Sequence, residues 1–211
     1  MTRDDARALE DCVAAGGVAV FYADTVYGLA CDPDDADAVR RLYELKGRAP
    51  LKPSAVMWFS RGAALAALPE LGGRTRGLLE QLLPGGITAL LPNPLKRFRL
   101  ACGPDPDTLG IRVPDVPPLA TVSRPVLQSS ANLAGEPAPS RLEDVPDSIR
   151  DGADLVLDGG PLPGLASTVL DLRSFEALSE WTIEREGLVS ASTIAAALGT
   201  LGNPSPLERR P

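Results

Sequence analysis

The stretch VAVFYADTVYGL (residues 18–29) joins a short apolar run to a polar segment. Residues 18–22 form the kind of apolar run that is typical of a buried strand. Asp24 and Thr25 follow it, and Gly28 then permits a close approach to the backbone. A carboxylate and a hydroxyl at this place have two interpretations: a strand-to-turn transition that Asp and Thr cap, or the beginning of a binding site.

Outward from this stretch, the chain is predicted to contain interspersed strands and helices. Further strands are predicted over residues 55–59, 87–91, 109–113, 126–129, 155–157, 167–172 and 181–183. Helices are predicted over residues 4–15, with Thr2 as N-cap, and over residues 34–46, 74–83 and 192–198. A short helix is predicted after Ser60, and a helical turn over residues 117–122. A capping box at Ser140–Glu143 predicts the start of a further helix.

The order of these elements predicts the fold class. Strands and helices do not follow the strict βαβ alternation of a doubly wound fold. We therefore predict an α/β fold of the α+β type, with one domain built on a twisted mixed sheet. This domain is expected to cover residues 1–198, and the Gly- and Pro-rich residues 199–211 are expected to form a flexible tail.

Length and charge restrict the location and the partners. The chain has 211 residues, which is enough for one substantial core. No apolar run is long enough for a membrane span, and the acidic start lacks the order of a signal peptide, so we expect a cytosolic protein that does not bind membranes. The net charge of −7 disfavours a broad nucleic-acid surface, and DNA is not an expected partner.

Histidine and cysteine content restricts the chemistry. Histidine is absent, which excludes Ser-His-Asp and Cys-His nucleophile systems and His-ligated metals. Cys12, Cys31 and Cys102 have no paired spacing, which argues against a disulfide framework and a zinc site. Any catalysis must therefore proceed by other means.

Three cations cluster at the end of the helix predicted over residues 34–46. Lys46, Arg48 and Lys52 lie close to Gly47 and to two prolines. Cations at a helix C-terminus complement the helix dipole, so a solvated helix end is one interpretation. The glycine and the prolines also stiffen the loop, and an arginine fork beside lysine point charges suits a triphosphate. From these residues alone, both interpretations stay open.

Polar side chains mark three other predicted strand ends. Residues 128–132 carry small hydroxyl and amide groups that can donate to phosphate or carboxylate oxygens, or that can form an Asx or Ser/Thr turn. Arg112 lies within an apolar strand pattern, where a charge needs a partner or an anionic ligand. Ser167 and Thr168 open a late strand.

In their order and spacing, these segments resemble the YrdC/YciO family of threonylcarbamoyl-AMP synthases. The motifs that carry the resemblance are Asp24-Thr-Val-Tyr-Gly-Leu29, Leu45-Lys-Gly-Arg48, Pro84-Gly with Thr88, Gly110-Ile-Arg-Val-Pro114, Ser130-Ala-Asn-Leu133 with Gly135, Leu157-Asp-Gly-Gly160 and Ser167-Thr-Val-Leu-Asp171. The resemblance extends from about Val18 to about Ser190, and its most diagnostic pairs are Lys46/Arg48 and Ser130/Asn132.

The resemblance implies a fold and an activity. The twisted sheet would surround a large central cavity lined with positive charge, as in the YrdC/RibB-like fold. L-threonine, bicarbonate or CO₂, and ATP would condense there to threonylcarbamoyl-AMP and pyrophosphate. A threonylcarbamoyl transferase complex would then transfer the threonylcarbamoyl group to an adenosine of tRNA.

The resemblance also implies roles for individual residues. Lys46 and Arg48 would form the catalytic pair. Threonine would be contacted by Thr25, Arg112 and Ser167, with Arg112 pairing with its carboxylate. ATP would be contacted by Arg48, Lys52, Thr108, Ser130, Asn132 and Arg185. Mg²⁺ would accompany the triphosphate, held by phosphate oxygens and water and not by a set of protein ligands.

Four places depart from the family pattern. Tyr22-Ala23 replaces a Pro-Thr pair, Met57 stands where many members carry histidine, Ala138 replaces a serine and Glu186 replaces a proline. These differences motivate two alternatives, which are a non-catalytic relative that binds RNA or the ribosome and a carbamoyl-transfer enzyme with another acceptor.

Overall fold

The computed structural model describes residues 1–47 and 52–199. Arg48 and nearly all of the expected tail lie outside these ranges. Within the described ranges the strands form a nine-stranded sheet in the order β7-β1-β2-β6-β3-β5-β4-β8-β9. The strands are β1 Ala19–Tyr22, β2 Tyr27–Cys31, β3 Ala55–Met57, β4 Ile87–Pro92, β5 Thr108–Arg112, β6 Val126–Ser130, β7 Leu155–Val156, β8 Thr168–Asp171 and β9 Thr182–Arg185. The pairs β1/β7, β3/β5 and β4/β8 are parallel and the others antiparallel, so the predicted mixed sheet is confirmed.

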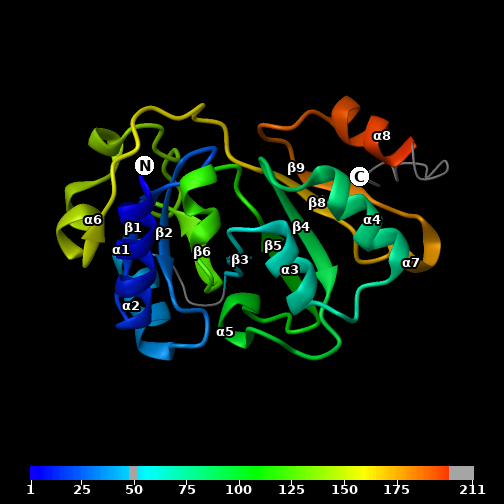
Figure 1. Ribbon diagram of the computed structural model, residues 1–211, viewed down its shortest axis with the longest axis horizontal. Helices are drawn as coiled ribbons and strands as arrows, with labels where there is room; N and C mark the ends of the chain where they lie inside the picture. Colours follow the sequence, from blue (N-terminus) through cyan, green and yellow to red (C-terminus); the bar gives the residue numbers. More distant parts are fainter. Residues whose placement is uncertain (48–51, 200–211) are drawn as a thin grey trace.

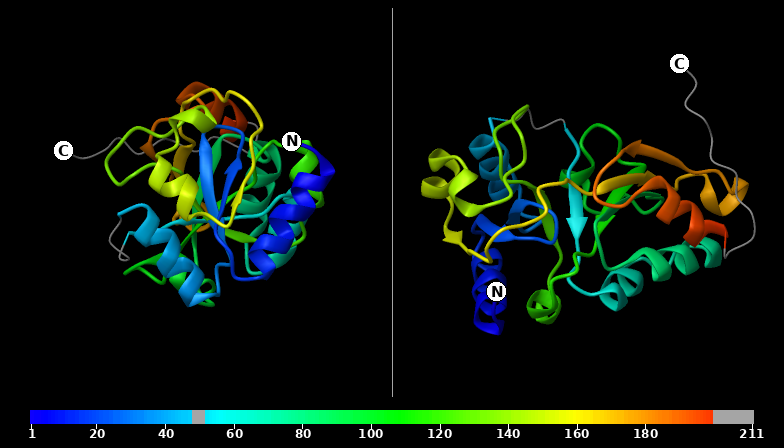
Figure 2. Two further views of the ribbon diagram at one scale, coloured as in Figure 1. Left: turned by 90° about the vertical axis from the view of Figure 1, so that its left-hand side faces the viewer. Right: turned by 90° about the horizontal axis from the view of Figure 1, so that it is seen from above.

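Helices lie toward both ends of the sheet, and α3 and α5 lie near its middle strands, as Figure 1 and the further views in Figure 2 show. The α-helices are α1 Arg3–Ala14, α2 Ala36–Leu45, α3 Arg61–Ala67, α4 Gly73–Leu82, α5 Arg99–Cys102, α6 Asp147–Gly152, α7 Phe175–Leu178 and α8 Ala191–Gly199, and the 3₁₀ helices are η1 Pro117–Thr121 and η2 Leu142–Asp144. In Figure 1, α1, α2 and α6 lie around β1 and β2, whereas α4, α7 and α8 lie beside β4, β8 and β9. No helix within residues 1–47 and 52–199 has the length and apolar character needed to cross a bilayer.

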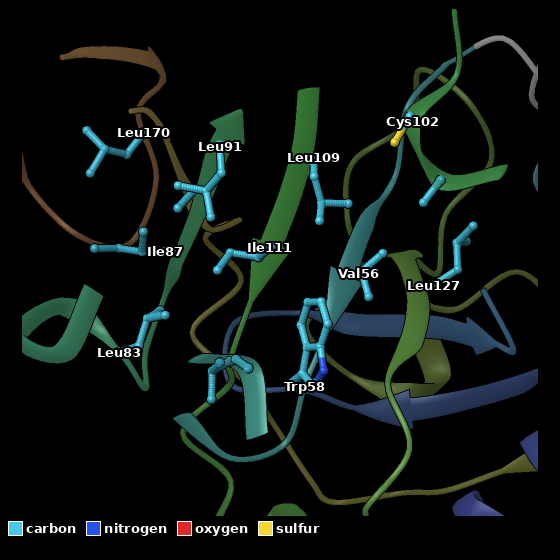
Figure 3. Close-up of a cluster of buried hydrophobic side chains, with 14 of the residues drawn as sticks. Val56, Trp58, Leu83, Ile87, Leu91, Cys102, Leu109, Ile111, Leu127 and Leu170 are labelled. Carbon is cyan, nitrogen blue, oxygen red and sulfur yellow. The ribbon is translucent and has the colours of Figure 1, made fainter. Parts of the chain in front are cut away.

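Strand β5 shows how the sequence separates the core from the site. Leu109 and Ile111 are fully buried and point into the large apolar cluster drawn in Figure 3, together with Trp58 and Leu170. Successive side chains of a strand point to opposite faces. The alternate residues Thr108, Gly110 and Arg112 therefore face the other side of the sheet, where they line a cavity.

Several predicted boundaries and caps are confirmed. Thr2 and Asp5 form a reciprocal capping box at the start of α1. The Ser60 hydroxyl accepts from the Ala63 backbone N–H at 3.1 Å and caps α3 as expected.

Helix α4 is capped by a residue distant in the sequence. It has no side-chain cap at Gly72, and the Glu176 carboxylate of α7 instead accepts from the backbone N–H of Thr75 at 2.9 Å. A Cβ at Gly72 would lie 2.1 Å from a Glu176 side-chain atom, so this approach requires glycine.

Three parts of the prediction differ from the structure. The predicted helix start at Ser140–Glu143 is wrong: Arg141 precedes only the 3₁₀ turn η2, without a side-chain cap, and α6 begins later. Strand β2 was not predicted, because its sequence YGLAC carries a glycine and few β-branched or aromatic residues. The four-residue helices α5 and α7 were also not predicted, since they are too short to show a helical repeat.

Candidate functional site

A cavity of about 470 Å³ lies on the polar face of the central strands. Strands β3, β4, β5, β6 and β8 all contribute to its wall, and β4 and β5 do so through alternate residues that the sheet register aligns. The lining residues are Val26, Pro53, Ser54, Ala55, Thr88, Leu90, Ala101, Cys102, Asp105, Thr108, Gly110, Arg112, Gln128, Ser129, Ser130, Ala166, Ser167, Val169, Arg173 and Arg185. The structure thus brings five of the expected site residues, Thr108, Arg112, Ser130, Ser167 and Arg185, to one cavity, and their roles stay predictions.

Arg112 is a buried cation at one end of the cavity. Its guanidinium forms an ion pair with Asp24 and donates to the Thr25 hydroxyl at 2.5 Å. Asp24 also accepts from the backbone N–H of Asp115 at 3.1 Å, which holds the carboxylate in place. Thr25 is therefore adjacent to the cavity through Arg112, although it is not among the lining residues. The partner that the apolar pattern around Arg112 required is Asp24, from the loop after β1.

The Arg112 guanidinium keeps unused donor capacity. Burial lowers its pKa, and the charge of Asp24 opposes this shift. Because a guanidinium titrates far above neutral pH, Arg112 remains charged. Within residues 1–47 and 52–199 its buried Nε has no hydrogen-bond partner. A buried donor without a partner is costly. Because the charged guanidinium lines the cavity, this end suits an anionic ligand.

A line of hydroxyl and guanidinium groups lies beside Arg112. The Thr88 and Ser167 hydroxyls are 2.8 Å apart. Arg185 of β9 donates to the Ser167 carbonyl at 2.8 Å and to its hydroxyl at 3.3 Å. These contacts connect β4, β8 and β9 around one small polar surface, which suits a carboxylate or phosphate oxygen.

The segment between β7 and β8 is fixed by Tyr27, and it leads to Ser167. The Tyr27 hydroxyl lies 2.5 Å from a carboxylate oxygen of Asp158 and accepts from the Gly159 N–H at 3.2 Å. Burial, followed by the Asp158 hydrogen bond, raises the pKa of Tyr27 to about 12, so the phenol stays protonated and can donate. Further along, the Gly164 N–H donates to the Thr25 carbonyl at 3.0 Å. This explains the sequence motif Leu157-Asp-Gly-Gly160 as an anchor for the segment.

Lys46 and Asn132 lie behind the cavity wall and not on it. Lys46 is buried, and its ammonium donates to the backbone carbonyls of Ser130 and Asn132, the latter at 2.8 Å. The Asn132 amide donates to the carbonyls of Leu133 and Glu136 at 2.9 and 2.6 Å. The two residues therefore fix the loop after β6 and, with it, the position of Ser130.

The remaining cations of the expected ATP site have different placements. Lys52 is exposed and is not among the lining residues, although Pro53 and Ser54 after it are. The Lys52 carbonyl accepts from the Tyr43 hydroxyl at 3.3 Å. Arg48 lies outside the described residues, so its expected contacts are not placed.

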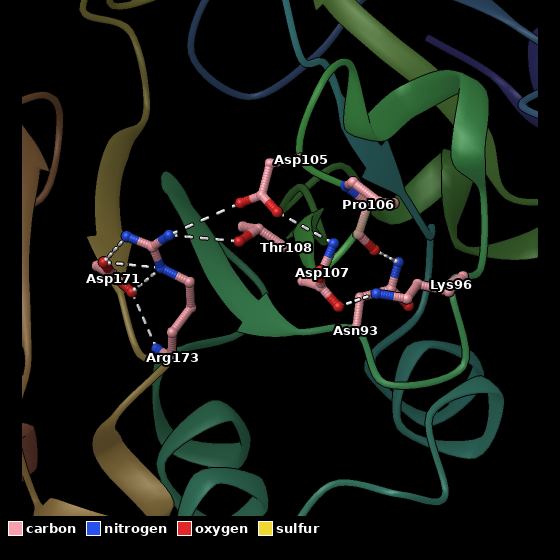
Figure 4. Close-up of polar contacts among 8 residues, drawn as sticks. All are labelled: Asn93, Lys96, Asp105, Pro106, Asp107, Thr108, Asp171 and Arg173. Carbon is pink, nitrogen blue, oxygen red and sulfur yellow. Dashed lines mark hydrogen bonds and ion pairs between the residues drawn. The ribbon is translucent and has the colours of Figure 1, made fainter.

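Asp105 and Arg173 are cavity residues that the sequence analysis missed. Arg173 pairs with Asp171 and donates to the Thr108 hydroxyl at 3.3 Å (Figure 4). Asp105 lies 3.9 Å from the same guanidinium. Their sequence signal is weak, because an Asp in a Pro-Asp-Pro-Asp loop and an Arg after a strand are both usual at a solvated surface.

Two departures from the family pattern also have clear placements. Met57 is fully buried, in register with Arg112 on the neighbouring strand, and belongs to the apolar cluster with Phe21 and Phe59. Glu186 is exposed beside Arg185. In the described part of the chain no group of three or more His, Cys, Asp or Glu side chains is arranged to hold a metal ion.

The fold and the cavity together define an α/β domain with a cavity lined by arginine, serine and threonine side chains on one face of a mixed sheet. The sequence matches the family model Sua5_yciO_yrdC, described as telomere recombination, over residues 11–187. The chain therefore belongs to the Sua5/YciO/YrdC family.

Named relatives extend this assignment. A threonylcarbamoyl-AMP synthase of Chromohalobacter salexigens is 35% identical over 185 residues, which cover 83% of this chain and 98% of the relative. The synthase of Bacillus subtilis is 33% identical over 171 residues, which cover 72% of this chain and 46% of the relative. This chain thus spans nearly all of the first relative and about half the length of the second.

Solved structures agree with the fold. Sua5 of Pyrococcus abyssi complexed with L-threonine superposes with a TM-score of 0.80 at 27% identity, covering 94% of this chain and 58% of that one. Escherichia coli YciO superposes with a TM-score of 0.77 at 24% identity, covering 92% of this chain and 94% of that one, which supports the fold alone.

Proposed function

We propose that this chain is a threonylcarbamoyl-AMP synthase, which condenses L-threonine, bicarbonate or CO₂, and ATP and releases pyrophosphate. The observation that carries the proposal is the buried Arg112 guanidinium, which donates to Thr25 and lines the same cavity of about 470 Å³ as Ser167. A structural relative at 27% identity is described as a complex with L-threonine. An α-carboxylate placed beside the Arg112 guanidinium would form charge-assisted hydrogen bonds with it.

The reaction requires no covalent protein nucleophile. The threonine amine adds to CO₂ and loses a proton to give a carbamate. A carbamate oxygen then attacks the α-phosphorus of ATP, and the bond from this phosphorus to the bridging oxygen of pyrophosphate breaks. Such transfers depend on positioning and charge stabilisation. Arg112 would orient the threonine, while Arg185 and the Ser130 hydroxyl would bind phosphate oxygens.

Other residues of the expected site would act through these groups. Lys46 and Asn132 would position Ser130 by fixing the loop after β6. Thr108 would contact the nucleotide from the opposite end of the cavity. Arg48 and Lys52 are proposed to complete the phosphate contacts. Mg²⁺ would supply charge neutralisation on the triphosphate and would be carried by phosphate oxygens and water.

The test is pyrophosphate release by the purified protein with ATP, Mg²⁺ and bicarbonate, with and without L-threonine. Release only in the presence of threonine, together with threonylcarbamoyl-AMP in the product mixture, supports the proposal. Release that does not require threonine, or that is greater with serine or another amine, would favour a carbamoyl-transfer enzyme with another acceptor. RNA binding that weakens with salt, without nucleotide turnover, would favour the non-catalytic relative.

Threonylcarbamoylation of tRNA follows as a separate proposal. The adenylate is an activated mixed anhydride, and a partner enzyme would transfer its acyl group to an adenosine. Full modification of tRNA on addition of a threonylcarbamoyl transferase complex would test this step, and tRNA would then be an indirect partner.

A further inference from the structure

The end of the cavity opposite Arg112 has its own set of polar groups. Asp105, Thr108 and Arg173 all line the cavity, and Figure 4 shows Arg173 pointing toward the other two. The sheet register explains why they meet. Strand β4 lies between β5 and β8. Its Pro92 is in register with Thr108 at the start of β5, and its Leu90 is in register with Asp171 at the end of β8. Arg173 follows Asp171 by two positions and therefore lies near the level of Thr108.

Arg173 sets the direction of the Thr108 hydroxyl. Its Nε donates to Asp171 at 3.0 Å, and this ion pair raises the pKa of the guanidinium and fixes its plane. The remaining Nη1 donates to the Thr108 oxygen at 3.3 Å. An arginine has no acceptor, so Thr108 must accept in this contact and keeps its own hydrogen for another partner. No residue in the ranges 1–47 and 52–199 accepts that hydrogen, and it is available to a ligand in the cavity.

Asp105 supplies an acceptor next to this donor. One of its oxygens accepts from the Asp107 backbone N–H at 3.1 Å, which fixes the carboxylate in a tight turn. The other lies 3.9 Å from Arg173 Nη1, the nitrogen that also contacts Thr108. An acceptor and a donor therefore stand side by side, held by one guanidinium.

A flat apolar floor lies between this end and Arg112. Leu90 and Gly110 are in register on neighbouring strands, and Ala55 lies on the other side of Gly110. A Cβ built at Gly110 would be 3.5 Å from Leu90 and 3.7 Å from Ala55, so the absence of a side chain leaves a shallow surface flanked by apolar atoms. Such a surface suits the face of a planar ring.

We propose that Asp105 and Thr108 read the base of the nucleotide, with Arg173 as the residue that positions Thr108. Asp105 accepts from the exocyclic amino group of adenine, and Thr108 donates to a neighbouring ring nitrogen. Guanine carries a carbonyl oxygen in place of that amino group and would oppose the carboxylate with a second acceptor. This inference rests on the proposed function, because it takes the bound nucleotide to be ATP. Asp105 and Thr108 would then make the cavity selective for adenine.

The test is the binding of ATP, GTP and 2′-deoxy-ATP, measured by titration calorimetry without threonine. Asp105→Asn keeps the acceptor for the turn but presents a donor to the cavity. We expect it to lower the ratio of ATP to GTP affinity by about tenfold and to leave the ratio of ATP to 2′-deoxy-ATP affinity unchanged. Asp107→Asn is the matched control, because Asp107 pairs with Lys96 and does not line the cavity. Thr108→Val and Arg173→Met should also lower the ratio of ATP affinity to GTP affinity.

The outcomes separate the inference from the proposed function. An equal loss of ATP and GTP affinity in Asp105→Asn overturns base reading, and so does a change confined to the ATP to 2′-deoxy-ATP ratio, which would place the ribose here. A thermal scan shows whether Asp105→Asn is folded. If it is not, the test passes to Thr108→Val, in which an unchanged ratio of ATP to GTP affinity overturns base reading. Adenine-selective binding that the variants abolish, in a protein that releases no pyrophosphate with threonine, would sustain base reading and reject the synthase.

Discussion

Replacing Arg112 by Met should separate the contribution of this residue to stability from its contribution to threonine binding. Arg112 and Asp24 form a buried ion pair in which the side chains are 3% and 8% exposed. The single variant leaves the Asp24 carboxylate desolvated and without its countercharge. The double variant Asp24→Asn/Arg112→Met removes both charges and keeps a side chain that accepts from the Asp115 N–H.

The expected cost follows from the burial of the pair. Breaking a buried ion pair by removal of one partner costs about 3–5 kcal/mol. Asp24 retains the hydrogen bond from Asp115 at 3.1 Å, so we expect the lower end, about 3 kcal/mol. In a protein of this size that corresponds to a fall of about 6–12 °C in the unfolding midpoint. The double variant should unfold within about 1 kcal/mol of the wild type, since removing both charges of a buried pair is often neutral.

Differential scanning calorimetry measures both midpoints, and titration with L-threonine below the lower midpoint measures binding. Both variants should lose threonine binding, whereas only Arg112→Met should lose stability. An Arg112→Met protein that is as stable as the wild type would refute the reasoning about the buried charge. A double variant that still binds threonine would refute the placement of the carboxylate on Arg112.

Three further predictions follow from positions outside this pair. Lys46→Met removes a buried donor to the Asn132 carbonyl and should lower the free energy of unfolding by about 1–3 kcal/mol, with ATP affinity falling alongside it; an unchanged midpoint in a thermal scan would contradict this role. Glu176→Gln weakens the cap on the N–H of Thr75 and should cost about 1 kcal/mol near neutral pH in urea unfolding. Because the Thr75 backbone hydrogen bond lowers the pKa of Glu176 below 4.5, this contribution is complete above that pH and is lost as the pH falls through the folded-state pKa, so a difference that persists unchanged to about pH 2 would be inconsistent with it. Gly110→Val fills the cavity floor from a site where a Cβ meets its neighbours at 3.5 Å, so ATP affinity in calorimetry should fall about tenfold or more while the protein still folds, and undiminished affinity would exclude a ligand on this floor.

Short apolar runs made many of the strands predictable. In residues 109–113 the apolar pattern indicated a strand, and the charge at Arg112 indicated a partner or an anion. The structure supplies Asp24 as the partner and keeps one donor unused. The identity of this partner was not predictable from local pattern, because the two residues are 88 positions apart and meet only through the order of the strands.

The end of the cavity formed by Asp105, Thr108 and Arg173 illustrates what local sequence does not show. Arg173 reaches Thr108 across 65 positions, and their contact depends on the register of β4 with β5 and β8. The direction of the Lys46 side chain was also not predictable from local sequence, because a cation at a helix end was compatible with a phosphate contact. There the ammonium turns inward to backbone carbonyls, which only the position of the loop after β6 determines.

The cap that Glu176 places on α4 also bears on the order of events during synthesis. The helix starts at Gly73, yet the carboxylate that satisfies its first turn is added to the chain 101 residues after Thr75. While the intervening segments leave the ribosome, the amino end of this helix has no side chain of its own to close it. The first turn of α4 therefore receives its cap only after α7 has been synthesised. Complete folding of α4 is thus coupled to the synthesis of the segment between β8 and β9.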